Sequence, residues 1–371
     1  MKCIGICLHT NRFTCCHPDE EGSRRMKTYE LSTTDIGFFL QTVHADTSCV
    51  LLAAAVNTFA FVKLIAGHVR QVLVANTFEL KSISFTNKKT DKVDAYKLAR
   101  ILKAQIMSGE EQVHEVVVSP QHIQDLRALF TTYRLIRKQI GAVKNRIHSL
   151  LKQNLMPFTK EYIFGNKRRR EIRGLCKGKE VLDFQINFLF DQLEQLEEKT
   201  DEIKEKIIEQ GSWYMKEIDI ITSMKGISVF TAIAVIADII TVTRFSNSKK
   251  FSNYLRSTPK VESSNEKTII KSTNKCSRKV AITLLSQALN HYRDTSPYAR
   301  TWYERLRQYK KPGVVRMGLC RKMICELYQM LKKEEYHYFR DPLNHRAKRE
   351  DYFKLLEERH IQIPTSLMKS A

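Results

Sequence analysis

Two aspartates three residues apart are the sharpest candidates for chemistry in this sequence. Asp91 and Asp94 begin a predicted helix in the string TDKVDA. Residues i and i+3 share one face of a helix, so the two carboxylates can hold a hard divalent cation between them or share one with a third ligand. The same spacing is typical of an ordinary acidic first turn, which the helix dipole stabilises. The spacing alone leaves both interpretations open.

The composition is strongly basic. The chain has 371 residues, with 62 Lys and Arg against 40 Asp and Glu, and a formal net charge of +22. A charge of this size repels itself unless a polyanion lies nearby, so nucleic acid is the first candidate partner, ahead of a membrane surface. A hydrophobic content of 43% is enough for well-packed cores and excludes a disordered chain.

The nine cysteines predict a reducing environment. The chain is far larger than the domains that need disulfides in place of a core, so a cytoplasmic protein, associated with the nucleoid, is the simplest expectation. Five residues near the N-terminus suggest a soft-metal site, although no CxxC pair is present, and we expect the thiols to pack within strands instead. These residues are Cys3, Cys7, Cys15, Cys16 and His17.

No membrane segment is expected. The N-terminus lacks a charged start followed by a long apolar run, which argues against a signal peptide. The apolar stretch at residues 49–67 is interrupted by Asn57 and Lys63, so it does not indicate a membrane-spanning helix.

Short apolar runs and turn signals alternate through the first hundred residues. Runs at 2–8, 12–16 and 25–31, with a DEEG turn at 19–22, predict a three-stranded meander. A buried-type strand at 50–55, helical spacing at 57–69 and a strand at 71–75 follow. This order predicts an α/β fold with a mixed sheet, over residues 1–115.

Residues 116–212 are predicted to form two long helices. Apolar residues recur at steps of 3 and 4 from Leu126 to Leu150 and from Leu182 to Ile207, with Thr200 as the one polar core position. Helices packed in a globular bundle would also show this pattern, but sustained heptads favour an extended coiled coil. The link between the helices carries a basic run, interpreted as a solvated loop at the tip of the arm that can grip phosphates. The run is Lys167, Arg168, Arg169 and Arg170.

A mostly α-helical domain is predicted at residues 213–335. The string ITSMKGISVFTAIAVIADI indicates two apolar helices joined by a tight turn at Gly226, which is a helix-hairpin-helix-like element. Such a hairpin presents backbone N–H groups beside Lys225, an arrangement that suits a DNA phosphate. Residues 257–277 are polar and loop-like, and residues 336–371 are expected to form a basic tail.

The order of these motifs resembles the DEDD transposases of Piv-like bacterial insertion sequences. The resemblance rests on VANTFELKSISFTNKKTDKVDAYKLARIL, on an IGI strand followed by His9, and on NTF at 57–59. It continues through GISVFTAIAVIADI, TRFSNSKKFSNYL and the RKM at 321–323, and so spans about residues 2–335. It implies a RuvC-like (RNase H-like) N-terminal domain, a coiled-coil connector that forms dimers or tetramers, and a C-terminal transposase domain with a nucleophilic serine.

The resemblance implies four metal-binding carboxylates, of which Asp91 and Asp94 are present. The first-strand aspartate falls on Cys7, and the fourth-strand glutamate falls on Ala53. Magnesium takes about six oxygen ligands and binds thiolate poorly, so we expect weak Mg²⁺ binding. Nothing in the sequence places a substitute carboxylate there. The candidates are Asp19, Glu20 and Asp46.

The family serine, which lies in a Ser-Gly pair after a proline, matches Ser264 best, with Ser263 as the fallback. In the family its hydroxyl attacks a backbone phosphate while the metal neutralises charge, so the reaction is a transesterification. Where the backbone needs positive φ, replacing a family glycine costs on the order of 1 kcal/mol or more. The replaced glycines fall on Val56, Arg256, Asn265 and Cys276.

The sequence therefore predicts an insertion-sequence transposase or site-specific recombinase that is impaired in this copy. Its implied partners are DNA and a structured guide RNA that bridges donor and target DNA. Two other interpretations stay open, a catalytically inactive DNA- and RNA-binding protein on the same scaffold, and a structural coiled-coil protein with incidental basic charge.

Overall fold

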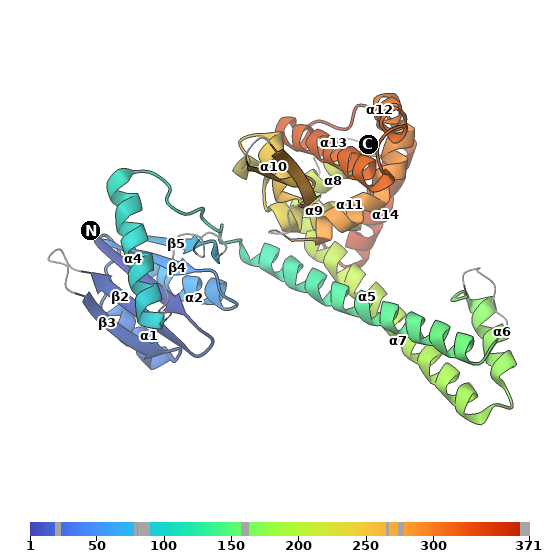
Figure 1. Ribbon diagram of the computed structural model, residues 1–371, viewed down its shortest axis with the longest axis horizontal. Coiled ribbons are helices and arrows are strands. Elements are labelled where there is room, and N and C mark those ends of the chain that lie inside the picture. The colour runs from blue at the N-terminus through green and yellow to red at the C-terminus, as the bar shows by residue number, and fades with distance from the viewer. Residues whose placement is uncertain are drawn as a thin grey trace. The chain divides into compact units, whose positions relative to one another are not determined.

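The computed structural model describes residues 1–18, 24–77, 80, 90–156, 163–264, 267–273 and 278–363, with only the backbone at 260–264 and 267–272. The chain divides into two compact units, residues 1–119 and 120–371 (Figure 1). The DEEG turn predicted at 19–22 lies outside the described residues.

The first unit is built on a mixed five-stranded sheet with the order β3-β2-β1-β4-β5. The first three strands form an antiparallel meander, and β4 runs parallel to β1 and to β5. This order confirms the predicted mixed α/β sheet and is consistent with an RNase H-like domain. The strands are β1 (Lys2–Leu8), β2 (Arg12–Pro18), β3 (Arg24–Glu30), β4 (Ser48–Ala53) and β5 (Gln71–Ala75).

Helices cover both faces of this sheet (Figure 1). Because side chains alternate along a strand, neighbouring residues of β1 enter different cores. Ile4 packs in a cluster with Phe39 and Phe61 of α1 and α2, whereas Cys3 packs in a cluster with Leu98 of α4. The helices are α1 (Thr33–Leu40), α2 (Thr58–Ile65) with the 3-10 turn η1 (Ala66–His68), and α4 (Asp91–Ser108).

The second unit is mostly helical. It contains one two-stranded hairpin, formed by β6 (Pro259–Ser264) and β7 (Lys267–Thr273), among the described residues. Its first five helices along the described chain are α5 (Gln121–Gln153), α6 (Asn166–Cys176), α7 (Glu180–Gln210), α8 (Met215–Thr222) and α9 (Val229–Ile239). The remaining helices are α10 (Ser248–Tyr254), α11 (Val280–Thr295), α12 (Pro297–Arg307), α13 (Pro312–Lys333) and α14 (Pro342–Glu358), with short 3-10 turns η2 (Gly211–Tyr214) and η3 (Val242–Arg244).

Helices α5 and α7 lie side by side, and α6 packs at the end of the pair (Figure 1). The predicted apolar stripes face each other, with Ile140 and Ile147 of α5 buried in one cluster with Ile186 and Phe190 of α7. Thr200 is buried, and its hydroxyl donates to the Leu196 carbonyl at 2.7 Å.

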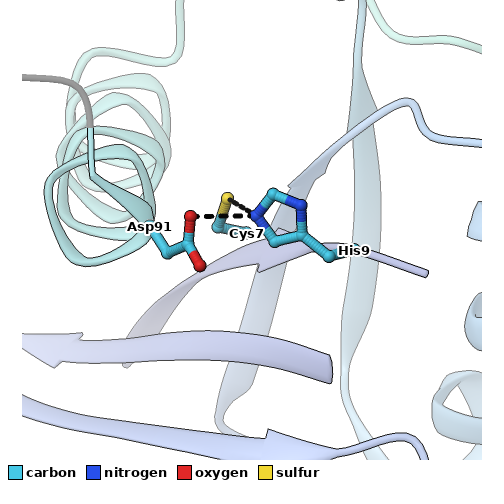
Figure 2. Close-up of side chains that lie close together, drawn as sticks. All are labelled: Cys7, His9 and Asp91. Carbon is cyan, nitrogen blue, oxygen red and sulfur yellow. Dashed lines mark hydrogen bonds and ion pairs between the residues drawn. The ribbon is translucent and has the colours of Figure 1, made fainter. Parts of the chain in front are cut away.

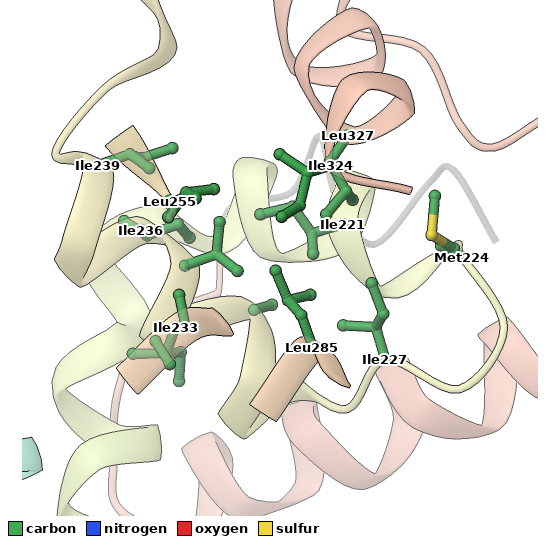
Figure 3. Packing of buried hydrophobic residues seen from close by; sticks show 14 of the residues in the cluster. Ile221, Met224, Ile227, Ile233, Ile236, Ile239, Leu255, Leu285, Ile324 and Leu327 are labelled. Atoms are coloured by element: carbon green, nitrogen blue, oxygen red, sulfur yellow. The ribbon is translucent and has the colours of Figure 1, made fainter. Parts of the chain in front are cut away.

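The core of the second unit is centred on α9, a helix that is buried along almost its whole length. Ile233 and Ile236 of α9 pack with Ile221 of α8, Leu285 of α11 and Ile324 of α13 (Figure 3). A helix that is apolar on all sides has to be enclosed by others. The string that predicted two apolar helices around Gly226 therefore forms the centre of this unit.

Three expectations about local structure were wrong. The basic run 167–170 lies in helix α6 and not in a loop, because Ile172 and Cys176, four residues apart, share a buried face. The segment 257–277 contains the β6–β7 hairpin and not a loop. The segment 336–371 contains α14, whose Tyr352 and Leu356 are buried in the core, and is not simply a tail.

None of the described helices is long and apolar enough to cross a membrane.

Candidate functional site

The carboxyl ends of two parallel strands bring the candidate metal positions together. Cys7 lies near the end of β1, and Ala53 ends β4. The parallel register pairs Ile6 with Leu52, so Cys7 and Ala53 are the next positions along the two neighbouring strands. Asp91 begins α4, the helix that packs across β1. The strand ends and the helix start thus form one edge of the first unit.

A glycine allows α4 to approach β1 this closely. A Cβ atom at Gly5 would lie 2.0 Å from the Ala95 carbonyl oxygen and 2.4 Å from the Ala99 backbone nitrogen. Only a residue without a side chain fits against a helix backbone at that distance. Sequence reasoning noted the IGI strand but missed this role. The signal in the sequence was a pair of alanines four residues apart in α4, Ala95 and Ala99, whose small side chains let a strand approach that face of the helix.

Three ligand-type side chains meet at this edge (Figure 2). His9 Nε2 lies 3.0 Å from Asp91 Oδ1 and 3.5 Å from Cys7 Sγ. The Arg12 guanidinium donates to the other carboxylate oxygen, Asp91 Oδ2, at 3.3 Å. The side chains of His9 and Asp91 are 48% and 31% exposed, so solvent reaches the cluster.

The backbone of His9 is held by the predicted NTF motif. Asn57 Nδ2 donates to the His9 carbonyl oxygen at 2.9 Å. This bond fixes the chain just after β1, where the imidazole turns toward Asp91. His9 entered the sequence analysis only as part of a motif, because nothing local shows that it lies beside a helix 82 residues away.

The structure does not gather all the predicted metal positions. Among the described residues, Cys7, His9 and Asp91 have ligand atoms that all lie within 4.8 Å of one another, and Asp94 and Asp46 are not in this group. The side chain of Ala53 offers no ligand, and Asp19 and Glu20 lie outside the described residues. One carboxylate, one imidazole and one thiol do not form the oxygen-rich set that Mg²⁺ needs. The cluster therefore does not fit magnesium.

The N-terminal cysteines considered as a soft-metal site do not lie together either. The sheet separates the thiols, with Cys3, Cys15 and Cys16 in three different buried clusters. Cys15 Sγ donates to the Lys27 carbonyl, and burial raises its pKa to about 12. None of the described cysteines forms a disulfide. The expectation that these thiols pack within strands is confirmed.

The candidate serines end strand β6. Ser263 pairs with Thr268 and Ser264 with Lys267 in the hairpin register, and only their backbone is described. Both belong to the second unit.

The replaced glycines give mixed results. Arg256, three residues before β6, has φ of +62°, the left-handed conformation in which glycine is favoured. Val56 is not among the residues with positive φ, so no such strain arises there. Asn265 and Cys276 lie outside the described residues.

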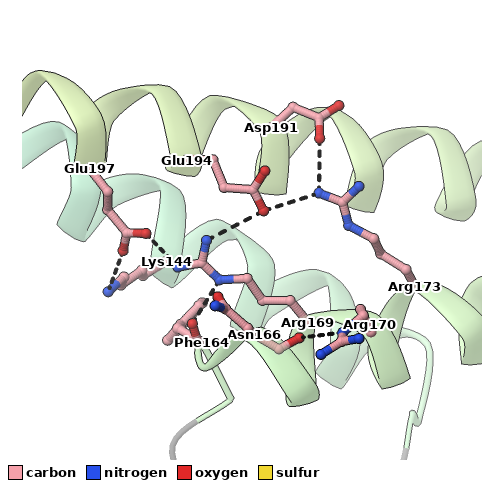
Figure 4. Close-up of polar contacts among 9 residues, drawn as sticks. All are labelled: Lys144, Phe164, Asn166, Arg169, Arg170, Arg173, Asp191, Glu194 and Glu197. Atoms are coloured by element: carbon pink, nitrogen blue, oxygen red, sulfur yellow. Dashed lines mark hydrogen bonds and ion pairs between the residues drawn. The ribbon is translucent and has the colours of Figure 1, made fainter.

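The basic run of α6 is divided between a buried ion-pair network and solvent (Figure 4). Arg169 is buried, donates to the Phe164 carbonyl at 2.7 Å, and pairs with Glu194 and Glu197 of α7. Its main effect is to fasten α6 to α7. Arg168 pairs with Glu171 on its own helix, whereas Lys167 and Arg170 are exposed.

The turn at Gly226 lies beside two lysines. Gly226 has φ of +87° and is exposed, and Lys225 lies 3.4 Å from Asp341 at the start of α14. Lys348 of α14 donates to the Thr222 carbonyl at 2.9 Å, and burial together with the nearby charge of Lys225 lowers its pKa to about 8. Lys225, Gly226 and Lys348 line a pocket of about 500 Å³. The turn thus places Lys225 and Lys348 beside the start of α9, the end of a helix whose dipole favours an anion.

Comparisons with known proteins find two family models along the chain. Residues 4–156 match a family model for a DEDD transposase of the IS110 type. Residues 218–304 match a family model described as the transposase IS116/IS110/IS902 family. No curated protein matches the chain.

Proposed function

Because the chain belongs to the IS110 family of DEDD insertion-sequence transposases, we propose that it acts on insertion-sequence DNA but carries out strand transfer poorly. The reaction proposed for an intact copy is transesterification, in which the Ser264 hydroxyl attacks a DNA backbone phosphate, a serine–phosphate ester forms, and the broken strand leaves as a hydroxyl that takes up a proton. The proposed partners are DNA and a structured guide RNA.

The observation that carries the proposal is the set of groups around Asp91. At the two strand ends where the family resemblance implies carboxylates, this chain has Cys7 and Ala53, and Asp91 is already bonded to His9 and Arg12. Magnesium-dependent activation of a phosphate needs several anionic oxygens around one ion. The residues present do not fit magnesium, so strand transfer by this chain is expected to be slow.

The basic charge of helix α5 supports nucleic-acid binding. Helix α5 carries seven Lys and Arg against one acidic residue, whereas α7 carries ten acidic residues against three Lys. The excess on α5 leaves a row of exposed cations that can replace the counterions of a phosphate backbone. This row is Arg134, Arg137, Lys138, Arg146 and Lys152. Lys167 and Arg170 of α6, and the turn at Lys225 and Gly226, are proposed as further phosphate contacts.

An exposed apolar stripe on α7 supports the proposed oligomer. Val181, Phe184 and Phe188 recur at steps of three and four and are 70%, 70% and 59% exposed. We propose that α5 and α7 form a coiled-coil arm and that this stripe packs against a second copy, giving a dimer or tetramer. Phe184→Glu should reduce the mass measured by light scattering, and Leu175→Glu on α6, also exposed, serves as the control.

A plasmid excision or inversion assay tests the proposal directly. The wild-type chain should show little strand exchange, and Cys7→Asp/Ala53→Glu should raise it because two oxygen ligands return to the site. Ser264→Ala should abolish the gained activity, whereas Ser263→Ala should spare it. Efficient, Ser264-dependent exchange by the wild-type chain would show that the proposed impairment is wrong.

The alternative function is a catalytically inactive binding protein on the same scaffold. It is favoured by the presence of Cys7 and Ala53 where the family resemblance implies carboxylates. The test is the revertant: if it binds DNA but still exchanges no strands, the alternative holds. Binding itself should weaken steeply between about 50 and 200 mM salt, because bound cations release counterions from the phosphates. Equal affinity at both salt concentrations would contradict both functions.

A further inference from the structure

We infer that Cys7, His9 and Asp91 form a site for a borderline-soft divalent cation of the zinc class. Sulfur, imidazole nitrogen and one carboxylate oxygen are the ligands that Zn²⁺ takes in proteins. Magnesium and calcium, in contrast, take oxygen ligands. The loss of the oxygen-rich set therefore changes which metal the edge of the sheet can hold.

The distances between the three ligand atoms fit a tetrahedral ion. Bonds of about 2.3 Å to sulfur and about 2.0–2.2 Å to nitrogen and oxygen place tetrahedral ligand atoms about 3.3–3.6 Å apart. His9 Nε2 lies 3.5 Å from Cys7 Sγ and 3.0 Å from Asp91 Oδ1, and all three atoms lie within 4.8 Å of one another. The two His9 distances lie within about 0.5 Å of this range, and the third pair, Cys7 with Asp91, has to close by at most about 1.2 Å.

The direction of the imidazole also favours a cation between the groups. The same nitrogen, His9 Nε2, faces both Cys7 Sγ and Asp91 Oδ1 (Figure 2). A single N–H cannot point at two acceptors with good geometry. A metal ion bound to the nitrogen lone pair would bond to all three atoms, and the thiolate and carboxylate would balance its two positive charges.

The surroundings supply the support that metal ligands usually have. Arg12 donates to Asp91 Oδ2, which leaves Oδ1 for the metal, and Asn57 holds the backbone of His9. Bonds of this kind orient ligands and tune their affinity. The half-exposed His9 indicates that the fourth position opens to solvent. An open position beside three protein ligands is typical of a reactive zinc site rather than a purely structural one.

Cobalt titration of the full chain, reduced and freed of metal by a chelator, tests this inference. Co²⁺ bound through Cys7 should give a thiolate-to-cobalt charge-transfer absorption that saturates near one ion per chain, and Zn²⁺ should displace it. Cys7→Ser should remove this absorption, and His9→Ala should weaken Co²⁺ binding at least about tenfold. Arg12→Ala should weaken it by about tenfold through the support given to Asp91.

Cys325→Ser is the matched control, because among the described cysteines only Cys7 and Cys325 are not buried. This variant should keep the full absorption. Circular dichroism on each variant separates lost ligands from lost folding. The inference is overturned if the wild-type chain gives no sulfur absorption, if the folded Cys7→Ser variant keeps it, or if Mg²⁺ competes as well as Zn²⁺. It does not depend on strand transfer, so an inactive protein that binds Zn²⁺ through Cys7 would support it and leave the proposed function to its own assay.

Discussion

Replacing Gly5 by alanine should destabilise the first unit and displace α4. The added Cβ would lie 2.0 Å from one backbone atom of α4 and 2.4 Å from another. A normal contact needs about 3.4 Å or more, so the helix would have to retreat by more than about 1 Å, since backbone atoms cannot rotate away as a side chain does. Overpacking usually lowers the free energy of unfolding by about 1–3 kcal/mol. Because the neighbours here are backbone atoms, we expect a loss of about 3 kcal/mol.

Hydrogen exchange of residues 91–108 measures this effect within α4 itself. A loss of about 3 kcal/mol corresponds to exchange about 100-fold faster for amides that open with the unit, because about 1.4 kcal/mol is tenfold. Gly37→Ala in α1 is the control, since an added Cβ there meets nothing within 4 Å. It should leave exchange unchanged or slow it slightly, because alanine favours a helix over glycine. If Gly5→Ala exchanges like the wild type, the close approach of α4 to β1 is wrong.

Three further changes should alter the stability of the second unit, each measured by urea denaturation. Arg256→Gly should raise the free energy of unfolding by about 0.5–1 kcal/mol by relieving the left-handed backbone at φ of +62°, and Arg256→Val should lower it by about 1 kcal/mol. Thr200→Val should raise the free energy of unfolding by about 0.5–1 kcal/mol, because the buried hydroxyl donates to a carbonyl of its own helix. An unchanged urea midpoint would contradict this reasoning. Arg127→Met should lower the free energy of unfolding by about 3 kcal/mol, because Arg127 is buried and donates to two carbonyls at the end of α9. Arg134→Met is the control: it lies on the exposed face of α5 and should change this free energy by less than about 0.5 kcal/mol.

Periodicity predicted those elements that bury one face. The long helices α5 and α7 agree with the sequence because their apolar residues recur at steps of three and four, and the strand at 71–75 agrees because it is a short continuous apolar run. The β6–β7 hairpin was missed because its segment is rich in polar and charged residues, although Thr268, Ile269 and Ile270 carry the β-branched signal of a strand. Helix α6 was missed because four cations in a row hide a short buried face.

The candidate site shows a different limit of sequence reasoning. Asp91 was singled out by its spacing from Asp94 at the start of a helix, and Cys7 because the family resemblance implies a carboxylate at its position. The position of His9 beside Asp91 could not be predicted from the sequence. The contact joins residues 82 positions apart and depends on how closely α4 packs against β1. The small residues that permit this packing, Gly5, Ala95 and Ala99, carry no chemical signal of their own. Geometry of this kind is fixed by tertiary packing, not by local pattern.

The position of Asp91 is set by packing rather than by its charge. Asp91 pairs with His9 and Arg12, whose side chains are 48% and 63% exposed, and exposed pairs of this kind contribute at most about 1 kcal/mol. The contact of α4 with Gly5, in contrast, sits among side chains that are fully buried, such as Ala95 and Ala99. The first unit can therefore hold Asp91 at the strand ends without any metal ion. It follows that the ligands at this edge can change from oxygen to sulfur and nitrogen while the sheet and helix stay in place, so a change of metal at this site does not require a change of fold.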